Sequence, residues 1–398
     1  MRIYMDAVNR AKGGLGLKPL KVANICDRFI KHEKEQVDLG NLSANRQHLR
    51  AVDVERYMKP FLVERGIDSL RANDLDAFRK FVKGYWVKGP GKAIEFIDAK
   101  RAGKPIRVLP KRKLLSLSTI NRIERELLMV LNFAADERHI SQNQVPRRPR
   151  REGARVRRAS FSDAEFEQLM RHLSNRVADA AMHLKRVKAD RIKLMCFCGM
   201  AAFSGIRPGI LMRLCWSDIS GFTPTPDIEI DEDGMPILSE HRRQRNRLTI
   251  RVVGKGKIGQ AIPLRQFEDY LCKLHRLFAK EVGRQPGSDD PIFSHSDGTA
   301  IASFNHSFGR VLDELGLRKD KNGLARTAYS FRHYYVTRSL EEGMPIQVVA
   351  ANCATSLEMI ERYYDHSEIE RHRSKLERES GMPHDPIGME SDFVIGLE

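Results

Sequence analysis

Four short segments of the chain combine apolar residues with polar side chains of the kinds that can act on phosphate esters. Rigid guanidinium groups can neutralise the charge that develops on a phosphate during attack, without a metal ion. Hydroxyl and ammonium groups can attack the phosphorus or protonate a leaving oxygen. The segments are SGIRPG with Arg207, VVGKGK with Lys255, YSFRHYY with Arg332 and His333, and ATSLEMIERYYDH with Tyr363 and Tyr364.

The polar residues of these segments also have simpler structural explanations. Arg207 lies between two apolar stretches, where an arginine needs an anionic partner, either a ligand or a buried carboxylate. Lys255 lies among glycines at the predicted tip of a β-hairpin, where exposed lysines are common. Arg332 and His333 fit the start of a surface helix. No segment alone therefore identifies a site.

The elements that must position these residues form a predicted domain that begins near residue 160. Ser162 to Glu165 is a capping box before an apolar run. A buried helix is expected over Arg191 to Ala202, broken at Gly205 to Pro208. A period of two then predicts strands at 228–230, 248–252 and 261–264, and helices are expected over 304–317, 331–342 and 357–364. The sequence thus predicts a mainly helical domain with a small antiparallel β-sheet.

The region before residue 146 is predicted to be a small helical domain. Apolar residues recur at helical spacing in Val22, Cys26, Phe29 and Ile30, and again in Ile120, Ile123, Leu127, Leu131 and Ala134. Two more helices are expected over 49–61, ending near Pro60, and over 74–82, whereas 87–115 reads as a long loop. Three polar residues at the start of the last helix could reach backbone phosphates: Ser118, Asn121 and Arg122.

The positive charge is concentrated in one part of the chain. The 398 residues carry a formal net charge of +17, and residues 101–158 hold 16 Lys or Arg against five acids, a net of +11. The densest run, RRPRREGARVRR, has too few apolar residues to form a core and is expected to be an extended linker along phosphates, or else simply solvated. Its arginines are Arg147, Arg148, Arg150, Arg151, Arg155, Arg157 and Arg158.

Composition narrows the class of protein. A large positive excess points to a polyanion, most often nucleic acid. No apolar run reaches the ~18 residues of a membrane span, and the first 20 residues lack a secretion signal. The cysteines are scattered along the chain. We therefore expect a soluble cytoplasmic protein without a membrane partner. There is no P-loop, HExxH motif or acidic cluster spaced for a metal, so no cofactor or metal is expected.

Taken in order, the four segments resemble the tyrosine recombinase or phage integrase family. That family has an arginine in a TGxRxxE-like turn, a lysine in a β-hairpin, an HxLRH-type box, a GH-type box and a tyrosine about ten residues later. Here they correspond to SGIRPGILMRL, VVGKGKIGQAIPL, YSFRHYYVT and CATSLEMIERYYDH. LSLSTINRIERELLMVLNFAADERHISQNQVP is also similar to the last helices of the family's N-terminal domain, so the resemblance spans about residues 20 to 370.

Two positions depart from the commonest family pattern. Tyr329 stands where most members have the first histidine of the HxLRH box, and Thr355 stands where most have a histidine or tryptophan. These resemble a subtype with YSLRH and MGTS boxes. Thr355 also fits a capping box with Glu358. Counting ten residues from Ala354, and the Tyr-x-His ending, favour Tyr364 as the nucleophile over Tyr363.

The resemblance implies a two-domain clamp around double-stranded DNA that cuts and rejoins strands through a 3′-phosphotyrosyl intermediate. Arg207 and Arg332 would bind the phosphate, Tyr364 would attack, and Lys255 would protonate the leaving hydroxyl, with His333 and Tyr329 near the phosphate. A homo-tetramer on two DNA sites, integrating or excising a mobile element, is implied. We expect a helical DNA-binding domain at 1–146, a basic linker at 147–159, a catalytic domain at 160–375 and an acidic tail at 376–398.

Two alternatives stay open at this point. One is a DNA-binding protein derived from such an enzyme but without catalysis, and the other is a type IB topoisomerase, which uses similar chemistry. The tail from Gly381 to Glu398, with four acids and no Lys or Arg, is either disordered or docks on a neighbouring protomer through Phe393, Val394 and Ile395.

Overall fold

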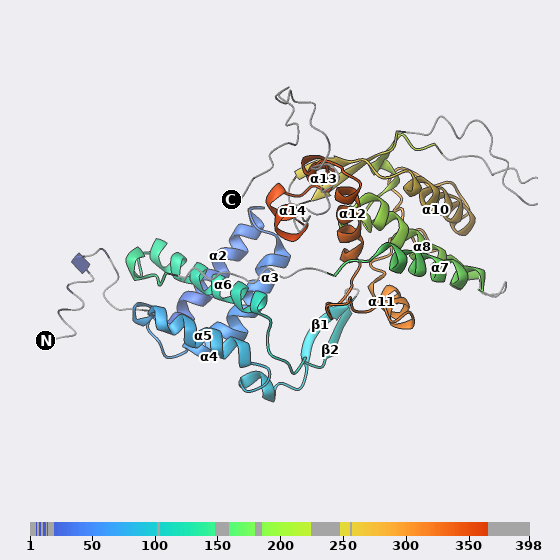
Figure 1. Cartoon of the computed structure of the whole chain (residues 1–398). Helices are drawn as coiled ribbons and strands as arrows, with labels where there is room; N and C mark the ends of the chain where they lie inside the picture. The colour runs from blue at the N-terminus through green and yellow to red at the C-terminus, as the bar shows by residue number, and fades with distance from the viewer. Residues whose placement is uncertain are drawn as a thin grey trace, which may run out of the picture. The chain divides into compact units, whose positions relative to one another are not determined.

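The computed structural model divides the chain into two compact units, Met1–Glu152 and Gly153–Glu398. It describes residues 20–101, 104–147, 159–179, 185–223, 247–254 and 257–364, together with residues 5, 8, 11, 12 and 14 (Figure 1). The strand predicted at 228–230 and the predicted acidic tail lie outside these residues. Each unit is described below by itself.

The first unit is built from helices around one apolar core. They are α2 (Val22–Asp38), α3 (Ala44–Asp53), α4 (Lys59–Leu62), α5 (Ala72–Gly84) and α6 (Leu117–Asp136). Short helical turns occur at η1 (Val54–Met58), η2 (Ile67–Ser69), η3 (Pro90–Ala93) and η4 (Gln142–Gln144). The five apolar residues whose spacing predicts the last helix are all buried in α6. One face of α6 therefore forms the centre of this core.

The helix predicted over 49–61 ends at Leu62, within one residue of the predicted end, but it begins earlier, at Ala44, and contains an irregular turn. Between α3 and α4 the chain forms the π-helical turn η1, in which the Lys59 N–H donates to the Val54 carbonyl, five residues back. Pro60 then lies in the first turn of α4. A proline is tolerated there because the first N–H groups of a helix have no partner within it.

The loop predicted over 87–115 contains a two-stranded antiparallel ribbon, which corrects the second expectation for this unit. Strand β1 (Ile97–Arg101) pairs with β2 (Lys104–Val108) in a register that sets Ile97 opposite Val108 and Arg101 opposite Lys104. In Figure 1 the ribbon lies outside the helices of its own unit. None of the strand residues whose burial is described is fully buried, which is why their sequence resembles a loop.

Ion pairs at low exposure join the helices of the first unit. Arg79 of α5 donates to Glu124 of α6 at 2.6 Å, and the Glu124 side chain has no exposed surface. Arg50 of α3 pairs with Glu33 of α2. Charges so far from solvent are tolerated because each has an opposite charge within hydrogen-bond distance.

The second unit is mainly helical with a small antiparallel sheet. Its helices are α7 (Asp163–Ala178), α8 (Lys185–Ser204), α9 (Pro208–Leu211), α10 (Gln266–Val282), α11 (Asn305–Glu314), α12 (Tyr329–Glu341), α13 (Ile346–Asn352) and α14 (Leu357–Tyr364). The Ser162 capping box forms as predicted, with Glu165 donating its N–H to the Ser162 Oγ and accepting the Ser162 N–H. The sequence did not predict α13.

The sheet of the second unit has the order β3-β4-β5 among the described residues. Strands β3 (Ile219–Ser220), β4 (Thr249–Gly254) and β5 (Lys257–Ala261) pair antiparallel, and a short helical turn, η5 (Trp216–Asp218), precedes β3. The last strand ends at Ala261, so the expected strand at 261–264 is displaced toward the hairpin turn.

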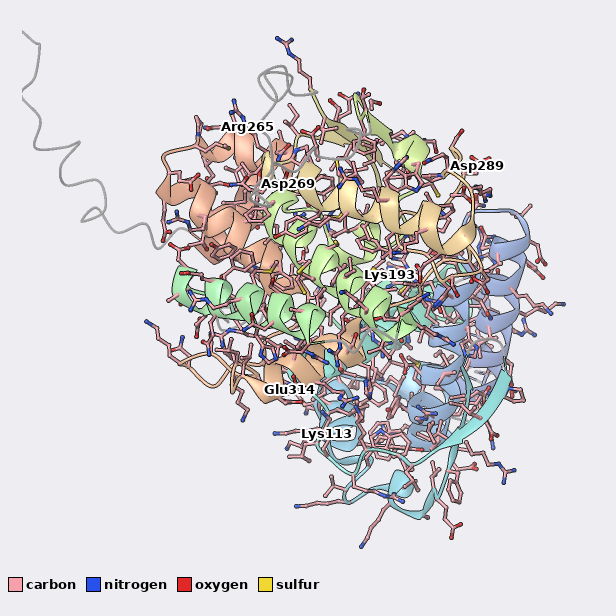
Figure 2. All side chains as sticks on the ribbon, turned by 90° about the vertical axis from the view of Figure 1, so that its right-hand side faces the viewer. Lys113, Lys193, Arg265, Asp269, Asp289 and Glu314 are labelled. Carbon is pink, nitrogen blue, oxygen red and sulfur yellow. The ribbon has the colours of Figure 1, made fainter. Side chains whose placement is uncertain are left out.

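Helix α8 is the centre of the second core. Its last ten residues are nearly all buried, and it packs against α7, α10 and α12. Lys193 of α8 lies beside α10 (Figure 2), where its Nζ is 2.6 Å from a Glu281 carboxylate oxygen. Among the residues that the structure describes, no helix is both long and apolar enough to cross a membrane.

Candidate active site

Arg207 is placed by the sharp turn that ends α8. Gly205 follows the helix with a φ of +62°, which only glycine adopts readily. A Cβ at this glycine would lie 2.3 Å from the Tyr335 ring and 2.9 Å from the Cys353 Sγ. The chain then turns directly into α9, with Arg207 immediately before its first residue. The turn is thus fixed both by backbone conformation and by close packing.

Arg332 lies in the first turn of α12 and reaches the same turn. The residue is 4% exposed, and its Nη1 donates to the Gly205 carbonyl at 2.8 Å. Burial lowers the pKa of Arg332 from its ordinary value, and the positive charge of Arg207 acts in the same direction. An arginine nevertheless stays protonated at neutral pH, so two positive charges are held close together here.

Arg207 also contacts the loop that leads into α14. Its Nη2 donates to the Ala354 carbonyl at 2.9 Å. Ala354 has a φ of +47°, the Ala354 N–H donates to the Ala351 carbonyl, and the Thr355 N–H donates to the Ala350 carbonyl. These are the two bonds of a Schellman motif, in which the left-handed residue is usually glycine. Ala354 therefore occupies a position where glycine is usual.

The residue that caps α14 is Ser356. Its Oγ accepts a hydrogen bond from the Met359 N–H, so the predicted capping box of Thr355 with Glu358 is wrong by one residue. Thr355 instead completes the C-terminal motif of α13. Ile360 is buried against α12 and α13 and fixes the rotation of α14. Tyr363 and Tyr364 form the last turn of this helix, and the positions of their side chains lie outside the description.

Tyr329 and His333 lie one turn apart on α12. Their ring centroids are 5.2 Å apart, and His333 is buried whereas Tyr329 is partly exposed. Tyr329 lines a groove of about 1120 Å³ together with Arg207, and it also lines a pocket of about 230 Å³ together with His333. Tyr329 thus adjoins the groove that Arg207 lines, and both Tyr329 and His333 adjoin the smaller pocket.

Lys255 and most of the predicted linker arginines lie outside the described residues. The register of the hairpin sets Gly254 opposite Lys257, so Lys255 follows the last paired residue of β4. Of the arginines in the linker, the structure describes Arg147, which is exposed. Arg148, Arg150, Arg151, Arg155, Arg157 and Arg158 are not described.

The three polar residues predicted to face phosphates in the first unit differ in their exposure and in their bonding partners. Ser118 is exposed near the start of α6. Asn121 accepts a hydrogen bond from Arg79 through its Oδ1. Arg122 forms ion pairs with Asp53 and Glu126, so its charge is already matched within the unit. Ser118 is therefore the most accessible of the three.

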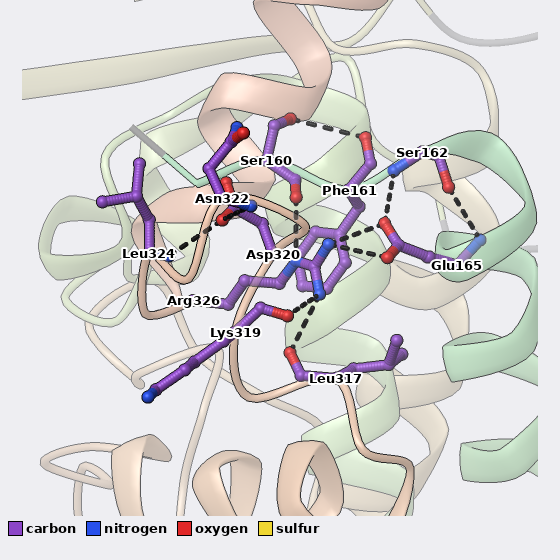
Figure 3. Close-up of polar contacts among 10 residues, drawn as sticks. All are labelled: Ser160, Phe161, Ser162, Glu165, Leu317, Lys319, Asp320, Asn322, Leu324 and Arg326. Carbon is purple, nitrogen blue, oxygen red and sulfur yellow. Dashed lines mark hydrogen bonds and ion pairs between the residues drawn. The ribbon is translucent and has the colours of Figure 1, made fainter. Parts of the chain in front are cut away.

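The sequence analysis did not identify Arg326, which holds the segment before α12. Its Nη2 lies 2.7 Å from both carboxylate oxygens of Glu165, and its Nε donates to the Ser160 carbonyl (Figure 3). Its Nη1 donates to the carbonyls of Leu317 and Lys319. An arginine three residues before Tyr329, on a polar stretch, gives no sequence signal of such a contact. The network ties the start of α7 to the loop that enters the candidate active site.

No model of a known protein family matches the chain. A curated relative, a tyrosine recombinase XerC-like protein of Caldanaerobacter subterraneus subsp. tengcongensis, is 23% identical over 252 residues. The match covers 59% of this chain and 58% of the relative, so the chain spans little more than half of that protein's length.

Several solved structures are similar over most of the chain. The Tn1549 transposon integrase in complex with transposon right end DNA has a TM-score of 0.56 at 15% identity, covering 90% of this chain and 99% of that one. The chain has the tyrosine recombinase fold. The XerH site-specific recombinase bound to difH substrate has a TM-score of 0.51 at 17% identity, covering 83% of this chain and 79% of that one. A lambda integrase dimer bound to a COC′ core site has a TM-score of 0.52 at 14% identity, covering 92% and 81%.

The tyrosine recombinase fold confirms the resemblance and the fold class expected from the sequence. Within this fold, the two arginines that carry the resemblance are brought together from distant positions. Arg207 and Arg332 meet at the Gly205 turn, and Arg207 contacts the loop that begins the tyrosine-bearing helix.

Proposed function

We propose that the protein is a tyrosine-type site-specific DNA recombinase. The observation that carries this proposal is the joining of three distant segments by two hydrogen bonds. Arg332 donates to the Gly205 carbonyl and Arg207 donates to the Ala354 carbonyl, at 2.8 and 2.9 Å. Two guanidinium groups are thereby held beside the loop that leads into α14, the helix with Tyr363 and Tyr364. The tyrosine recombinase fold of the chain supports the same activity.

The guanidinium groups of Arg207 and Arg332 would bind the non-bridging oxygens of one DNA phosphate. Each phosphate carries a negative charge that grows during attack, and preorganised positive groups stabilise that charge without rearranging. Arg332 is buried and fixed, whereas Arg207 is partly exposed and lines the groove. Arg332 would therefore set the position of the phosphate, and Arg207 would contact it from the solvent side.

The phenol of Tyr364 would attack the phosphorus and form a bond to it, while the bond to the 5′ oxygen breaks. An ordinary tyrosine has a pKa near 10, so it must lose its proton during attack or lie among cations that favour the phenolate. The expelled deoxyribose oxygen needs a proton, which Lys255 would donate. Rejoining reverses these steps with a hydroxyl from another strand, and no nucleoside triphosphate is consumed.

Tyr329 and His333 would position the phosphate by hydrogen bonds. They lie one turn apart on α12, on either side of Arg332 in the sequence. Tyr329 lines the groove together with Arg207, and both residues line the smaller pocket. The DNA duplex would also contact Ser118 and the arginines of the linker at 147–159. We further propose that the enzyme acts as a homo-tetramer on two DNA sites, integrating or excising a mobile element, and that the domains divide as the sequence predicts.

A nicked suicide substrate tests the proposed function. The nick lies close to the crossover phosphate, so that cleavage releases a short fragment and traps the covalent intermediate. The parent protein is expected to form an adduct that resists denaturant, and Tyr364→Phe is expected to abolish it while Tyr363→Phe keeps it. The reverse pattern would move the nucleophile to Tyr363. A parent that binds the DNA but forms no adduct would contradict the proposal and favour a DNA-binding protein without catalysis.

A recombinase and a type IB topoisomerase can be distinguished by whether the protein requires a particular DNA sequence. A recombinase cleaves at a defined site and exchanges strands between two such sites. Relaxation of supercoiled plasmids without any site preference, and without joint molecules, would instead indicate a type IB topoisomerase. Sedimentation of the protein with two-site DNA tests the tetramer, which would be contradicted by a species with only one protomer per site.

A further inference from the structure

The side chain of Asn352, the last residue of α13, bonds to two other elements of the second unit. Its Oδ1 accepts a hydrogen bond from the Ile262 N–H at 2.7 Å, and its Nδ2 donates to the Ile262 carbonyl at 3.0 Å. The same Nδ2 donates to the Tyr335 hydroxyl of α12 at 2.8 Å. A carboxamide has one acceptor oxygen and two N–H donors, so each of these groups has a partner here. Asn352 therefore joins the segment after β5 to α12.

The segment after β5 is attached at a second point. The Leu264 N–H donates to the Phe203 carbonyl, in the last turn of α8, at 2.8 Å. The Ile262 side chain is 67% exposed, so the main chain of this residue makes the attachment to Asn352. Helix α13 packs against α12, α14 and β5, and Figure 1 shows the three helices side by side. Residues 262–264 thus link the end of α8 to the end of α13.

Tyr335 connects Asn352 to the turn after α8. The residue is 3% exposed, and its ring lies so close to Gly205 that a Cβ on this glycine would be 2.3 Å away. The Gly205 carbonyl accepts the hydrogen bond of Arg332. Buried side chains are packed with little free space, so a shift of the Tyr335 ring would move the carbonyl that holds Arg332.

Asn352 is connected to Arg207 through the main chain. It lies two residues before Ala354, whose carbonyl accepts the hydrogen bond of the Arg207 Nη2. Cys353, between them, is 2% exposed, and its Sγ would be 2.9 Å from a Cβ on Gly205. The end of α13 thus packs against the same turn that Tyr335 contacts. Both arginines therefore bond to carbonyls whose positions depend on the surroundings of Asn352.

We propose that Asn352 is a positioning residue for DNA cleavage, which holds the guanidinium groups of Arg207 and Arg332 where they bind the phosphate. It acts through the Tyr335 hydroxyl and through the main chain that leads to Ala354. The proposal rests on the proposed function, because the phosphate is that of the DNA to be cut. An asparagine that only ended α13 would bond within its own helix, whereas the three hydrogen bonds of this side chain reach other elements.

Single-turnover adduct formation on the nicked suicide substrate tests this role, with DNA affinity and thermal stability measured for each variant. Asn352→Ala removes the three hydrogen bonds, and Tyr335→Phe removes one of them while keeping the ring against Gly205. At saturating DNA we expect the cleavage rate to fall by roughly 10- to 100-fold in Asn352→Ala and by a smaller factor in Tyr335→Phe, because misplaced reacting groups slow the chemical step. The DNA affinity should not change. A purely structural role would lower the melting temperature without slowing cleavage well below it.

Tyr334→Phe is the matched control. Tyr334 is the neighbouring residue on α12, and its hydroxyl donates to Asp163 at 2.9 Å instead of bonding to Asn352. This variant should cleave DNA at the rate of the parent. The double variant Asn352→Ala/Tyr335→Phe should be no slower than Asn352→Ala alone, because both changes remove the same link.

Three results would overturn the positioning role and leave the recombinase function intact. They are cleavage at the parent's rate in Asn352→Ala, an equal loss of rate in Tyr334→Phe, and a loss of DNA affinity as large as the loss of rate. Circular dichroism checks the fold of each variant, and if Asn352→Ala does not fold, the rate of Tyr335→Phe decides in the same way. A parent that forms no adduct would instead contradict the proposed function itself.

Discussion

The Nη2 of Arg207 donates a hydrogen bond to the main-chain carbonyl of Ala354 across 147 positions of sequence, at a distance of 2.9 Å. This bond joins the turn after α8 to the loop before α14. The same guanidinium lines the open groove of about 1120 Å³. Arg207 therefore holds the loop and also faces the groove, where we propose that it presents its charge to a phosphate.

Replacing Arg207 by lysine is expected to impair strand cleavage while DNA binding is kept. Lysine supplies a charge but not the planar fork that holds a carbonyl and a phosphate together. We expect the rate of adduct formation to fall by roughly 100-fold, in line with the loss of one preorganised donor. The measurement is single-turnover adduct formation. Arg213→Lys, which lines the same groove, is the matched control, and an equal loss there would contradict a specific role for Arg207.

Ala354→Gly is expected to stabilise the protein. Ala354 has a φ of +47°, where an alanine is strained and a glycine is not. The free energy of unfolding should rise by about 0.5 to 1 kcal/mol. Ala351→Gly, in the helical part of α13, should lower it by a similar amount, because glycine weakens a helix interior. Thermal or denaturant unfolding measures both, and a loss in each variant would refute the strained backbone at Ala354.

Gly205→Ala is expected to distort the main chain of the turn that positions Arg207 and Arg332. The φ of +62° disfavours a side chain, and the new Cβ would lie 2.3 Å from the Tyr335 ring. We expect a loss of about 2 kcal/mol or more in the free energy of unfolding, with cleavage impaired because both arginines depend on this turn. For Gly209→Ala, no heavy atom lies within 4 Å of the new Cβ, so unfolding should change little. Equal unfolding free energies for the two variants would disagree with this structure.

The network of Arg326 should contribute strongly to stability. The guanidinium is 3% exposed and is bonded to Glu165 and to three backbone carbonyls. Arg326→Gln would leave a carboxylate and these carbonyls without their donor, at a cost of about 3 kcal/mol. The control is Arg171→Gln on α7, whose ion pair with Glu167 is exposed and should contribute less than ~1 kcal/mol. Denaturant unfolding compares the two, and similar midpoints would rule out the network as a stabilising element.

The stability of the first unit should depend on the ionisation of Glu126. Burial, and then the neighbouring Asp53, raise the pKa of Glu126 to about 7 from an ordinary value of 4.5. The folded state thus holds a proton that the unfolded state has lost between these pH values, so stability falls as the pH rises from 4.5 to about 7. Glu126→Gln should remove this dependence, so the variant should be more stable than the parent above pH 7.

A second variant tests the same pH dependence of stability without replacing Glu126. Asp53→Asn removes the charge that opposes ionisation of Glu126 in the folded state, so the fall in stability should still begin near pH 4.5 but should end at lower pH. Melting temperatures between pH 4 and 9 measure both variants. A profile in Glu126→Gln that still falls between pH 4.5 and 7 would show that another group is responsible.

Sequence patterns predict individual helices correctly where the pattern reflects which residues are buried. The spacing of Ile120, Ile123 and Leu127 predicts α6 because each of these residues packs into the core on one helical face. The Ser162 capping box likewise depends only on neighbours within four residues. The β1–β2 ribbon was missed because none of its strand residues whose burial is described is fully buried, so burial imposes no clear alternation.

The sequence by itself determined the types and order of the candidate catalytic residues, since Arg207, Arg332 and the tyrosine pair lie in short motifs that can be recognised locally. Only the tertiary structure decided what holds them together: Arg332 on the Gly205 carbonyl, Arg207 on the Ala354 carbonyl, and Arg326 on Glu165. Each of these bonds joins positions more than 120 residues apart. Such a bond depends on how whole helices pack, which no local pattern encodes.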